Sequence, residues 1–224
     1  SKYTPALRDK AYYYYYLRKW NDALVALEAL KNNAPDVSTD DEMLLANTYF
    51  ITKNYDKCTQ LVDHIMGEDR GKTYLVRLLA YCEFEKGNFQ KSADMMQRYF
   101  KEAPAEKVLF SDYLYLGKSL VKTKGDTLVA ISNLKKAIEM DTVKGSETWK
   151  INQEIADLYY AKKDNCNSAK YYVIFLDSVP RPQPTDLYKL GVAQYFCKDD
   201  TMRYVNAEKT FIRVTELAPK AGIG

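Results

Sequence analysis

The chain has 224 residues, 46% hydrophobic and 28% charged, a balance typical of a folded protein and not of a disordered tail. Its 33 basic and 30 acidic residues give a net charge of +3 and are interleaved along the chain, which does not indicate a nucleic-acid partner. No apolar run approaches the roughly 18–20 residues that a membrane-spanning helix needs.

Small residues recur along the chain in the same apolar surroundings, with steps of 34 to 39 residues. The first series comprises Ala11, Ala46, Ala80, Gly117, Ala156 and Gly191. The second comprises Ala23, Cys58, Ser92, Ala130, Ala169 and Ala207. Two series with nearly the same step indicate an internal repeat, and each repeat holds one member of each series.

A polar turn separates the two small residues of each repeat. In chain order these turns are 18–19, 53–54, 86–88, 122–126, 162–167 and 198–203. Apolar residues on either side follow helical spacing, as in 130–138, so each repeat is predicted to be helix, turn, helix. The predicted repeats are 4–37, 39–72, 73–106, 110–144, 149–182 and 184–221. Pro35, Pro104 and Pro219 close three of them, because proline can end a helix but not continue it.

The pattern resembles that of the tetratricopeptide repeat. The fourth repeat contains Tyr113-x-x-Leu116-Gly117, and the sixth contains Leu190-Gly191, Ala207-x-x-x-Phe211 and Pro219. This resemblance covers nearly the whole chain and implies an all-α fold, a right-handed superhelical solenoid of antiparallel hairpins that forms a single domain over 1–224. We also expect the chain to be a segment of a longer protein, with further repeats or a cap beyond one or both ends.

Few residues are arranged for chemistry. The segment Gly67–Thr73 is similar to a phosphate-binding loop, but only three residues separate its glycines and no strand leads into it. His64 has no partner in a catalytic or metal-ligand arrangement, and the cysteines form no Cys-x-x-Cys pair. We therefore expect no enzyme activity, no metal and no cofactor.

The four cysteines fall into two groups. Cys58 and Cys82 occupy helical positions and are predicted to be small core residues. Cys166 and Cys197 lie in or beside the turns of adjacent repeats; two free thiols are the default expectation, and a disulfide between these residues is the alternative, since neighbouring turns lie close enough for one. A disulfide there would favour an oxidising compartment.

One face of the first helices is unusually rich in aromatic residues, and in the tetratricopeptide family this face lines a concave groove that holds peptides. Its aromatic members are Tyr12, Tyr15, Tyr16, Phe50, Tyr74, Tyr81, Phe84, Tyr160, Tyr188, Tyr195 and Phe196. Polar members named as candidate contacts are Arg8, Asn47, Arg77, Lys118 and Lys122. Such rings suit a binding face, but they could equally fill the space between repeats.

The chaperone-tail clamp of this family is absent, because Tyr12 and Leu44 occupy the positions that it needs as asparagine. We expect instead a non-catalytic scaffold that binds a protein or peptide, without nucleic acid, membrane span or small-molecule substrate. The alternative is a helper domain of a longer chain whose catalytic or signalling module lies elsewhere. The composition resembles bacterial envelope-associated repeat arrays, which favours the periplasm or cell envelope over the cytoplasm.

Overall fold

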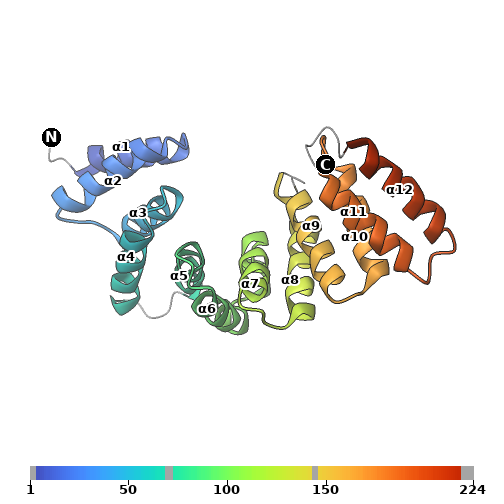
Figure 1. Cartoon of the computed structure of the whole chain (residues 1–224). Coiled ribbons are helices and arrows are strands. Elements are labelled where there is room, and N and C mark those ends of the chain that lie inside the picture. The colour runs from blue at the N-terminus through green and yellow to red at the C-terminus, as the bar shows by residue number, and fades with distance from the viewer. Residues whose placement is uncertain (1–3, 69–72, 143–145, 218–224) are drawn as a thin grey trace. The chain divides into compact units, whose positions relative to one another are not determined.

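A computed structural model describes residues 4–68, 73–142 and 146–217, and the chain divides into two compact units, 1–125 and 126–224 (Figure 1). Unit 1 contains α1 (Thr4–Tyr16), α2 (Trp20–Asn33), α3 (Thr39–Ile51), α4 (Tyr55–Glu68), α5 (Thr73–Glu85), α6 (Phe89–Glu102), the short 3₁₀ helix η1 (Ala105–Lys107) and α7 (Phe110–Lys122). Unit 2 contains α8 (Thr127–Met140), α9 (Ser146–Ala161), α10 (Asn165–Asp177), α11 (Pro184–Phe196) and α12 (Arg203–Leu217).

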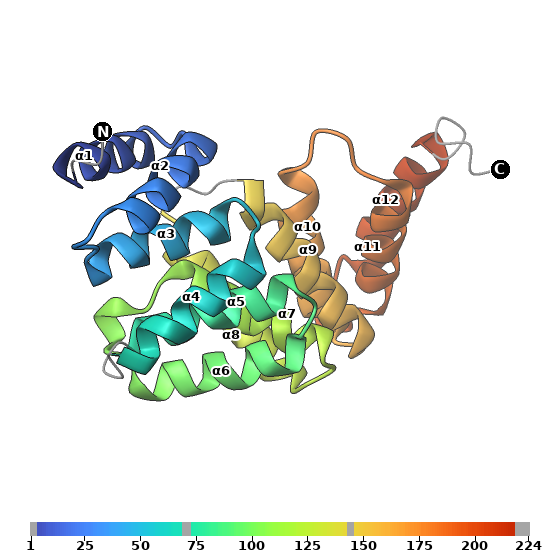
Figure 2. The same cartoon turned by 90° about the vertical axis from the view of Figure 1, so that its left-hand side faces the viewer.

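The described residues are otherwise turns and connections, with no strand among them, and the predicted all-α fold of helical hairpins is confirmed. Within each unit, successive helices pack against one another, and Figure 2 shows α11 and α12 side by side as one such pair. No helix in the described ranges is both long and apolar enough to cross a membrane.

Five of the turns between helices end the preceding helix in the same way. Each contains one residue with a positive φ angle, and these residues are Arg18, Lys53, Gly87, Lys124 and Lys163. In the second of these turns, the N–H of Lys53 donates to the carbonyl of Phe50, and that of Asn54 donates to Tyr49. This pair of bonds is a Schellman cap, which satisfies the last carbonyl groups of a helix and reverses the chain within a few residues.

The turn of the fifth repeat is shorter than the sequence predicts. Residues 162–167 were expected to form it, but α10 already begins at Asn165, so the turn matches those of the first three repeats. As a result Ser168, which is fully buried, takes the place predicted for Ala169, which is half-buried. The adjacent polar residues 164–167 hid the helix start, and Asp164 caps it by accepting from the N–H of Asn167.

The sixth hairpin has a different turn. Residues 197–202 connect α11 to α12, and none of them has a positive φ angle. Cys197 at the end of α11 forms a disulfide with Cys166 in the first turn of α10, and their Cα atoms lie 4.6 Å apart. The disulfide therefore joins the fifth hairpin to the sixth at the place where the Schellman cap is missing.

Each unit has its own apolar core between the helices. In unit 1 the core includes the predicted small residues Ala11, Ala46 and Cys58 together with Cys82, all fully buried. The neighbouring Cys58 thiol, together with burial, raises the pKa of Cys82. In unit 2, Tyr172 and Phe175 of α10 pack in one cluster with Leu187 of α11.

Candidate functional site

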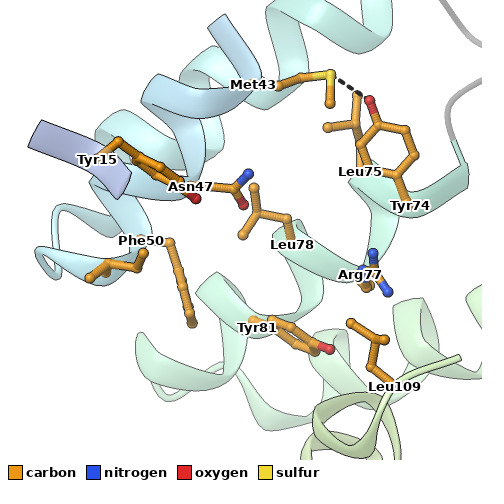
Figure 3. A pocket seen from close by; sticks show the side chains of 11 residues that line it. Tyr15, Met43, Asn47, Phe50, Tyr74, Leu75, Arg77, Leu78, Tyr81 and Leu109 are labelled. Atoms are coloured by element: carbon orange, nitrogen blue, oxygen red, sulfur yellow. Dashed lines mark hydrogen bonds between the residues drawn. The ribbon is translucent and has the colours of Figure 1, made fainter. Parts of the chain in front are cut away.

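A pocket of about 310 Å³ lies in unit 1, at the low end of volumes typical of ligand sites (Figure 3). Its lining comes mainly from α1, α3 and α5, which are the first helices of three successive hairpins, and from Leu109 just before α7. The complete lining is Tyr15, Met43, Asn47, Phe50, Ile51, Tyr74, Leu75, Arg77, Leu78, Tyr81 and Leu109. The structure therefore brings six residues of the predicted face, Tyr15, Asn47, Phe50, Tyr74, Arg77 and Tyr81, into one hollow.

The amide of Asn47 is the polar group most available in this pocket. Figure 3 shows it reaching from α3 toward Leu78 on α5. Asn47 is half-buried, and its side chain has no hydrogen bond to any residue that the structure describes. The Tyr15 hydroxyl is likewise without one within the described ranges, and burial raises its pKa, so it stays a neutral donor at physiological pH. Two uncommitted polar groups thus face apolar walls.

Arg77 and Tyr81 are held in place by the buried carboxylate of Asp112 on α7. Nη1 of Arg77 lies 3.5 Å from Oδ2 of Asp112 and donates to the Lys107 carbonyl at 3.2 Å. The Tyr81 hydroxyl donates to Oδ1 of the same carboxylate. Burial and then the charge of Asp112 raise the pKa of Tyr81. The Tyr81 ring forms pocket wall, whereas its hydroxyl is committed to the core, so the residue has both of the roles that the sequence left open.

The other donor groups of Arg77 stay available. Its contacts to Asp112, Lys107 and Tyr99 all use Nη1, which leaves Nε and Nη2 without a hydrogen bond to the described residues. Its side chain is only 21% exposed. A half-buried guanidinium with free N–H groups can bind a carbonyl or a carboxylate that enters the pocket.

Arg8 does not line the pocket and instead pairs with a carboxylate on the next first helix. Its Nε lies 3.0 Å from Oδ1 of Asp41 on α3, and its Nη2 lies 2.9 Å from Oδ2. Burial opposes the ionisation of Asp41, but the hydrogen bonds from Arg8 and Ser38 outweigh it and lower the pKa. Asp41 also caps α3 by accepting from the N–H of Ser38 at 2.9 Å.

In unit 2, the third residue of a first helix is again a buried aspartate. Asp186, the third residue of α11, accepts from Nε2 of Gln153 at 3.2 Å. No arginine is present here, and burial, only partly offset by Gln153, raises the pKa of Asp186. We call the contacts Arg8–Asp41, Arg77–Asp112 and Gln153–Asp186 the carboxylate rungs, because each ties the first helix of one hairpin to that of the next.

The remaining candidates in unit 1 lie outside the pocket lining. Tyr12 and Phe84 are half-buried, and the Phe84 ring packs on Tyr115 with centroids 5.1 Å apart. Tyr16 is 75% exposed, and Lys118 and Lys122 lie on α7, half-buried and exposed respectively. The predicted aromatic face is thus partly pocket wall, partly packing between helices and partly open surface.

Unit 2 holds the last four members of the predicted face, Tyr160, Tyr188, Tyr195 and Phe196, the last of which is 56% exposed. Tyr160 is half-buried, with its ring centroid 6.4 Å from that of Tyr172. Tyr188 and Tyr195 on α11 are 55% and 47% exposed, and their rings lie near Phe211 and Tyr204 of α12. None of these residues lines the pocket of unit 1.

Sequence reasoning missed several residues that build the site. The apolar lining residues Met43, Leu75 and Leu78 read as ordinary helical core, and Leu109 lies in a connection. The rung carboxylates Asp41 and Asp112 carried one usable signal, since each is the third residue of a first helix, where a carboxylate caps the N-terminus. Their partners lie more than thirty residues away, and local spacing does not reveal them.

The sequence predicts neither a metal site nor a catalytic site. Among the described residues, no three His, Cys, Asp or Glu side chains gather as a metal site would require. His64 lies exposed on α4. The segment similar to a phosphate-binding loop includes residues 69–72, which lie outside the described residues.

No protein-family model matches the chain, and no curated protein matches it. Solved structures do. The C-terminal part of a repeat-containing protein from Cytophaga hutchinsonii is 25% identical, with a TM-score of 0.56, over 78% of this chain and 64% of that one. The match therefore spans less than two thirds of the Cytophaga chain.

Two further structures match over most of their length. PilF from Pseudomonas aeruginosa is 14% identical with a TM-score of 0.64, covering 96% of this chain and 92% of its own. YrrB, described as a tetratricopeptide protein with an unusual peptide-binding site, is also 14% identical with a TM-score of 0.64, over 88% and 93%. These likenesses confirm that the chain has the tetratricopeptide-repeat fold.

Proposed function

We propose that the chain is a non-catalytic scaffold that binds a segment of another protein, with the pocket of unit 1 as its anchor site. The observation that carries the proposal is the pairing of uncommitted polar groups, Asn47 and Tyr15, with a pocket whose other walls are largely aliphatic and aromatic. These groups have no hydrogen bond to the described residues and remain accessible from the pocket, so a bound peptide backbone can take the place of the water that solvates them.

The chemistry of the pocket indicates what such a segment carries. A bulky apolar side chain would fill the space between Phe50, Leu78 and Leu109. The Asn47 amide can both donate to and accept from one peptide unit of an extended backbone. The free N–H groups of Arg77 would bind a backbone carbonyl or an acidic side chain next to the apolar one.

A structural neighbour supports peptide binding, and the disulfide supports a cellular location. YrrB is described by its peptide-binding site, which is consistent with a peptide site on the same fold. The Cys166–Cys197 disulfide supports an oxidising compartment, since such bonds rarely persist in the cytosol. We therefore favour the periplasm or cell envelope as the location.

A random peptide library, selected on the intact chain, tests the proposal. Selected peptides should carry a bulky apolar residue and bind in solution by fluorescence polarisation. Asn47→Ala should weaken their binding about 10-fold or more, because the amide then offers the peptide backbone no partner. Tyr16→Ala removes an exposed ring outside the pocket lining and should leave binding unchanged.

Asn47→Ala should not disturb the fold, because the amide has no hydrogen bond to the described residues. Circular dichroism of the variant checks this. Peptides that bind the wild type and Asn47→Ala equally, or a library from which nothing is enriched, would contradict the assignment of the pocket.

A further inference from the structure

The outer face of α12 in unit 2 carries an apolar stripe that the described part of the chain leaves largely uncovered. We define the α12 stripe as Tyr204, Ala207, Glu208, Phe211, Ile212 and Thr215, which together with Tyr195 line a hollow of about 420 Å³. Tyr204 is 55% exposed and Ile212 is 52% exposed. Large apolar side chains on one helical stripe are typical of a helix that packs against another.

Every earlier second helix uses the same stripe to hold the first helix of the next hairpin. In α2, Glu28 accepts from the Tyr49 hydroxyl of α3 at 2.8 Å. Lys135 of α8 donates to the Tyr159 hydroxyl of α9 at 2.8 Å. Counted from the buried small residue of each helix, Glu28 and Lys135 occupy the place that Ile212 has in α12.

Other positions of the stripe behave in the same way. The Phe100 ring of α6 packs 4.8 Å from the Tyr113 ring of α7, and Phe100 corresponds to Thr215. Tyr172 of α10 is fully buried in the cluster that includes Leu187 of α11, and it corresponds to Phe211, which is only half-buried. The α12 stripe therefore corresponds to the surface that earlier second helices present to the first helix of the next hairpin.

The first helix that packs on this surface also has a recognisable feature. Ser119 of α7 donates to Ser92 of α6 at 3.1 Å, so a small residue on the first helix meets the small residue of the preceding second helix. The corresponding residues Thr48, Cys82 and Ala193 are also fully buried. The exception is α9, which has a half-buried leucine at this place. On α12 the residue at this place is Ala207, which is only 1% exposed and lines the floor of the hollow.

A second copy of this chain does not supply a matching helix at its start. In α1 the corresponding residue is Tyr13, which is 61% exposed. A tyrosine there would hold the two helices apart where the other pairs approach closely. Head-to-tail stacking of α12 on the α1 of another copy is thus disfavoured by one large side chain.

We propose that the α12 stripe is a second docking surface, which takes an amphipathic helix of a partner protein. The partner helix carries a small residue, such as alanine or serine, in the middle of its apolar face and aliphatic residues one turn away, as α11 presents to α10. This site is independent of the pocket in unit 1. The continuity of the stripe with the interface between α10 and α11 identifies the occupant as a helix and not an extended segment.

The test uses a hydrocarbon-stapled, fluorescein-labelled helical peptide with the sequence of residues 184–196 as its probe. Fluorescence polarisation should show saturable binding to the intact chain. Ile212→Lys should weaken this binding at least 10-fold, and Val25→Lys, a change at a 68% exposed residue of α2, should not. A probe in which the alanine corresponding to Ala193 is replaced by tryptophan should also lose binding.

Ile212 is largely exposed, so Ile212→Lys should keep the fold, which circular dichroism checks. Absence of saturable binding, or equal binding to the wild type and Ile212→Lys, overturns the proposal. Sedimentation velocity provides the remaining outcome. If the chain self-associates through a contact that Ile212→Lys abolishes, the occupant is a second copy and the proposed partner helix is wrong.

Discussion

The carboxylate rungs show how one residue position settles the contact between neighbouring first helices. Asp41, Asp112 and Asp186 each stand third in their helix, where a carboxylate is favoured by the free N–H groups of the first turn. The partner differs, being Arg8, Arg77 or Gln153. A charged partner lowers the pKa of Asp41, whereas the neutral amide leaves that of Asp186 raised by burial.

Arg8→Gln should lower the free energy of unfolding of unit 1 at neutral pH, because the Asp41 carboxylate stays buried without its charged partner. The folded pKa of Asp41 lies below its ordinary value of about 3.9, so ionised Asp41 stabilises the fold above that value. This contribution is lost as the pH falls through the lowered pKa. Urea unfolding at several pH values should therefore show the difference between wild type and variant shrinking in acid.

Arg98→Gln is the matched control. Arg98 pairs with Glu102 on the surface of α6, where both side chains are substantially exposed, so its removal should change stability by at most about 0.5 kcal/mol. An Arg8→Gln difference that stays constant down to acid pH would show that the contact acts through packing and not through the charge of Asp41.

At the scale of the element, the hairpins could be predicted because their signals are local. Small residues, helical apolar spacing and polar turns all lie within one repeat, and the helix ends followed them closely. The fifth turn was predicted too long, because Asn165 and Asn167 are typical of turns, yet they stand in the first turn of α10. The five recurring Schellman caps were not predicted, since four of their positive-φ residues are lysine or arginine and not glycine.

The packing of α11 on α12 depends on the absence of a side chain at Gly191. A Cβ atom at this residue would lie 2.6 Å from a ring carbon of Phe211. Gly191→Ala should therefore destabilise unit 2 by about 1–3 kcal/mol, because the ring must move out of its contact with α11. Chemical denaturation measures the change.

A second substitution distinguishes this cause from a general effect on the helix. Leucine is smaller than phenylalanine and leaves more room for a Cβ atom at residue 191. Gly191→Ala should therefore lower the free energy of unfolding less in the Phe211→Leu variant than in the wild type. Because alanine is the better helix former, an effect on propensity alone would make Gly191→Ala stabilising. A stabilised single variant, or losses that simply add, would contradict the proposed contact.

For the whole molecule, the sequence predicted the order of the helices, and the structure adds a division into two units between α7 and α8. The candidate site was predicted only in part. The aromatic face was found by periodicity, but which rings form a pocket depends on contacts between residues about thirty positions apart. Asn47 and Arg77 were among the predicted contacts, whereas Met43, Leu78 and Leu109 carry no distinguishing signal.

The Cys166–Cys197 disulfide lies entirely within unit 2 and closes a loop with a sequence separation of 31 residues. Cys197→Ser should lower the stability of unit 2 by about 2–4 kcal/mol, mainly because the unfolded chain regains the freedom that the closed loop denies it. Tryptophan fluorescence can follow the units separately, since the two tryptophans are Trp20 in unit 1 and Trp149 in unit 2.

Variants with one tryptophan, Trp20→Phe or Trp149→Phe, should each report one unfolding transition. The transition seen by Trp149 should shift with Cys197→Ser or with reductant, and that seen by Trp20 should not. Equal shifts at both tryptophans would show that the two units unfold together, and no shift at either would show that the disulfide does not stabilise unit 2.

Photo-crosslinking in the source cell tests the central claim, that the pocket of unit 1 holds a segment of another protein. The crosslinker p-benzoylphenylalanine is placed at Ile51, which lines the pocket and is 38% exposed, or at Val25 on α2, which is 68% exposed and outside the pocket lining. We predict a discrete crosslinked protein when the crosslinker is at position 51. This product should not form from position 25, and it should be lost when Asn47→Ala is added. The same crosslinked protein from both positions, or none from position 51, would contradict it.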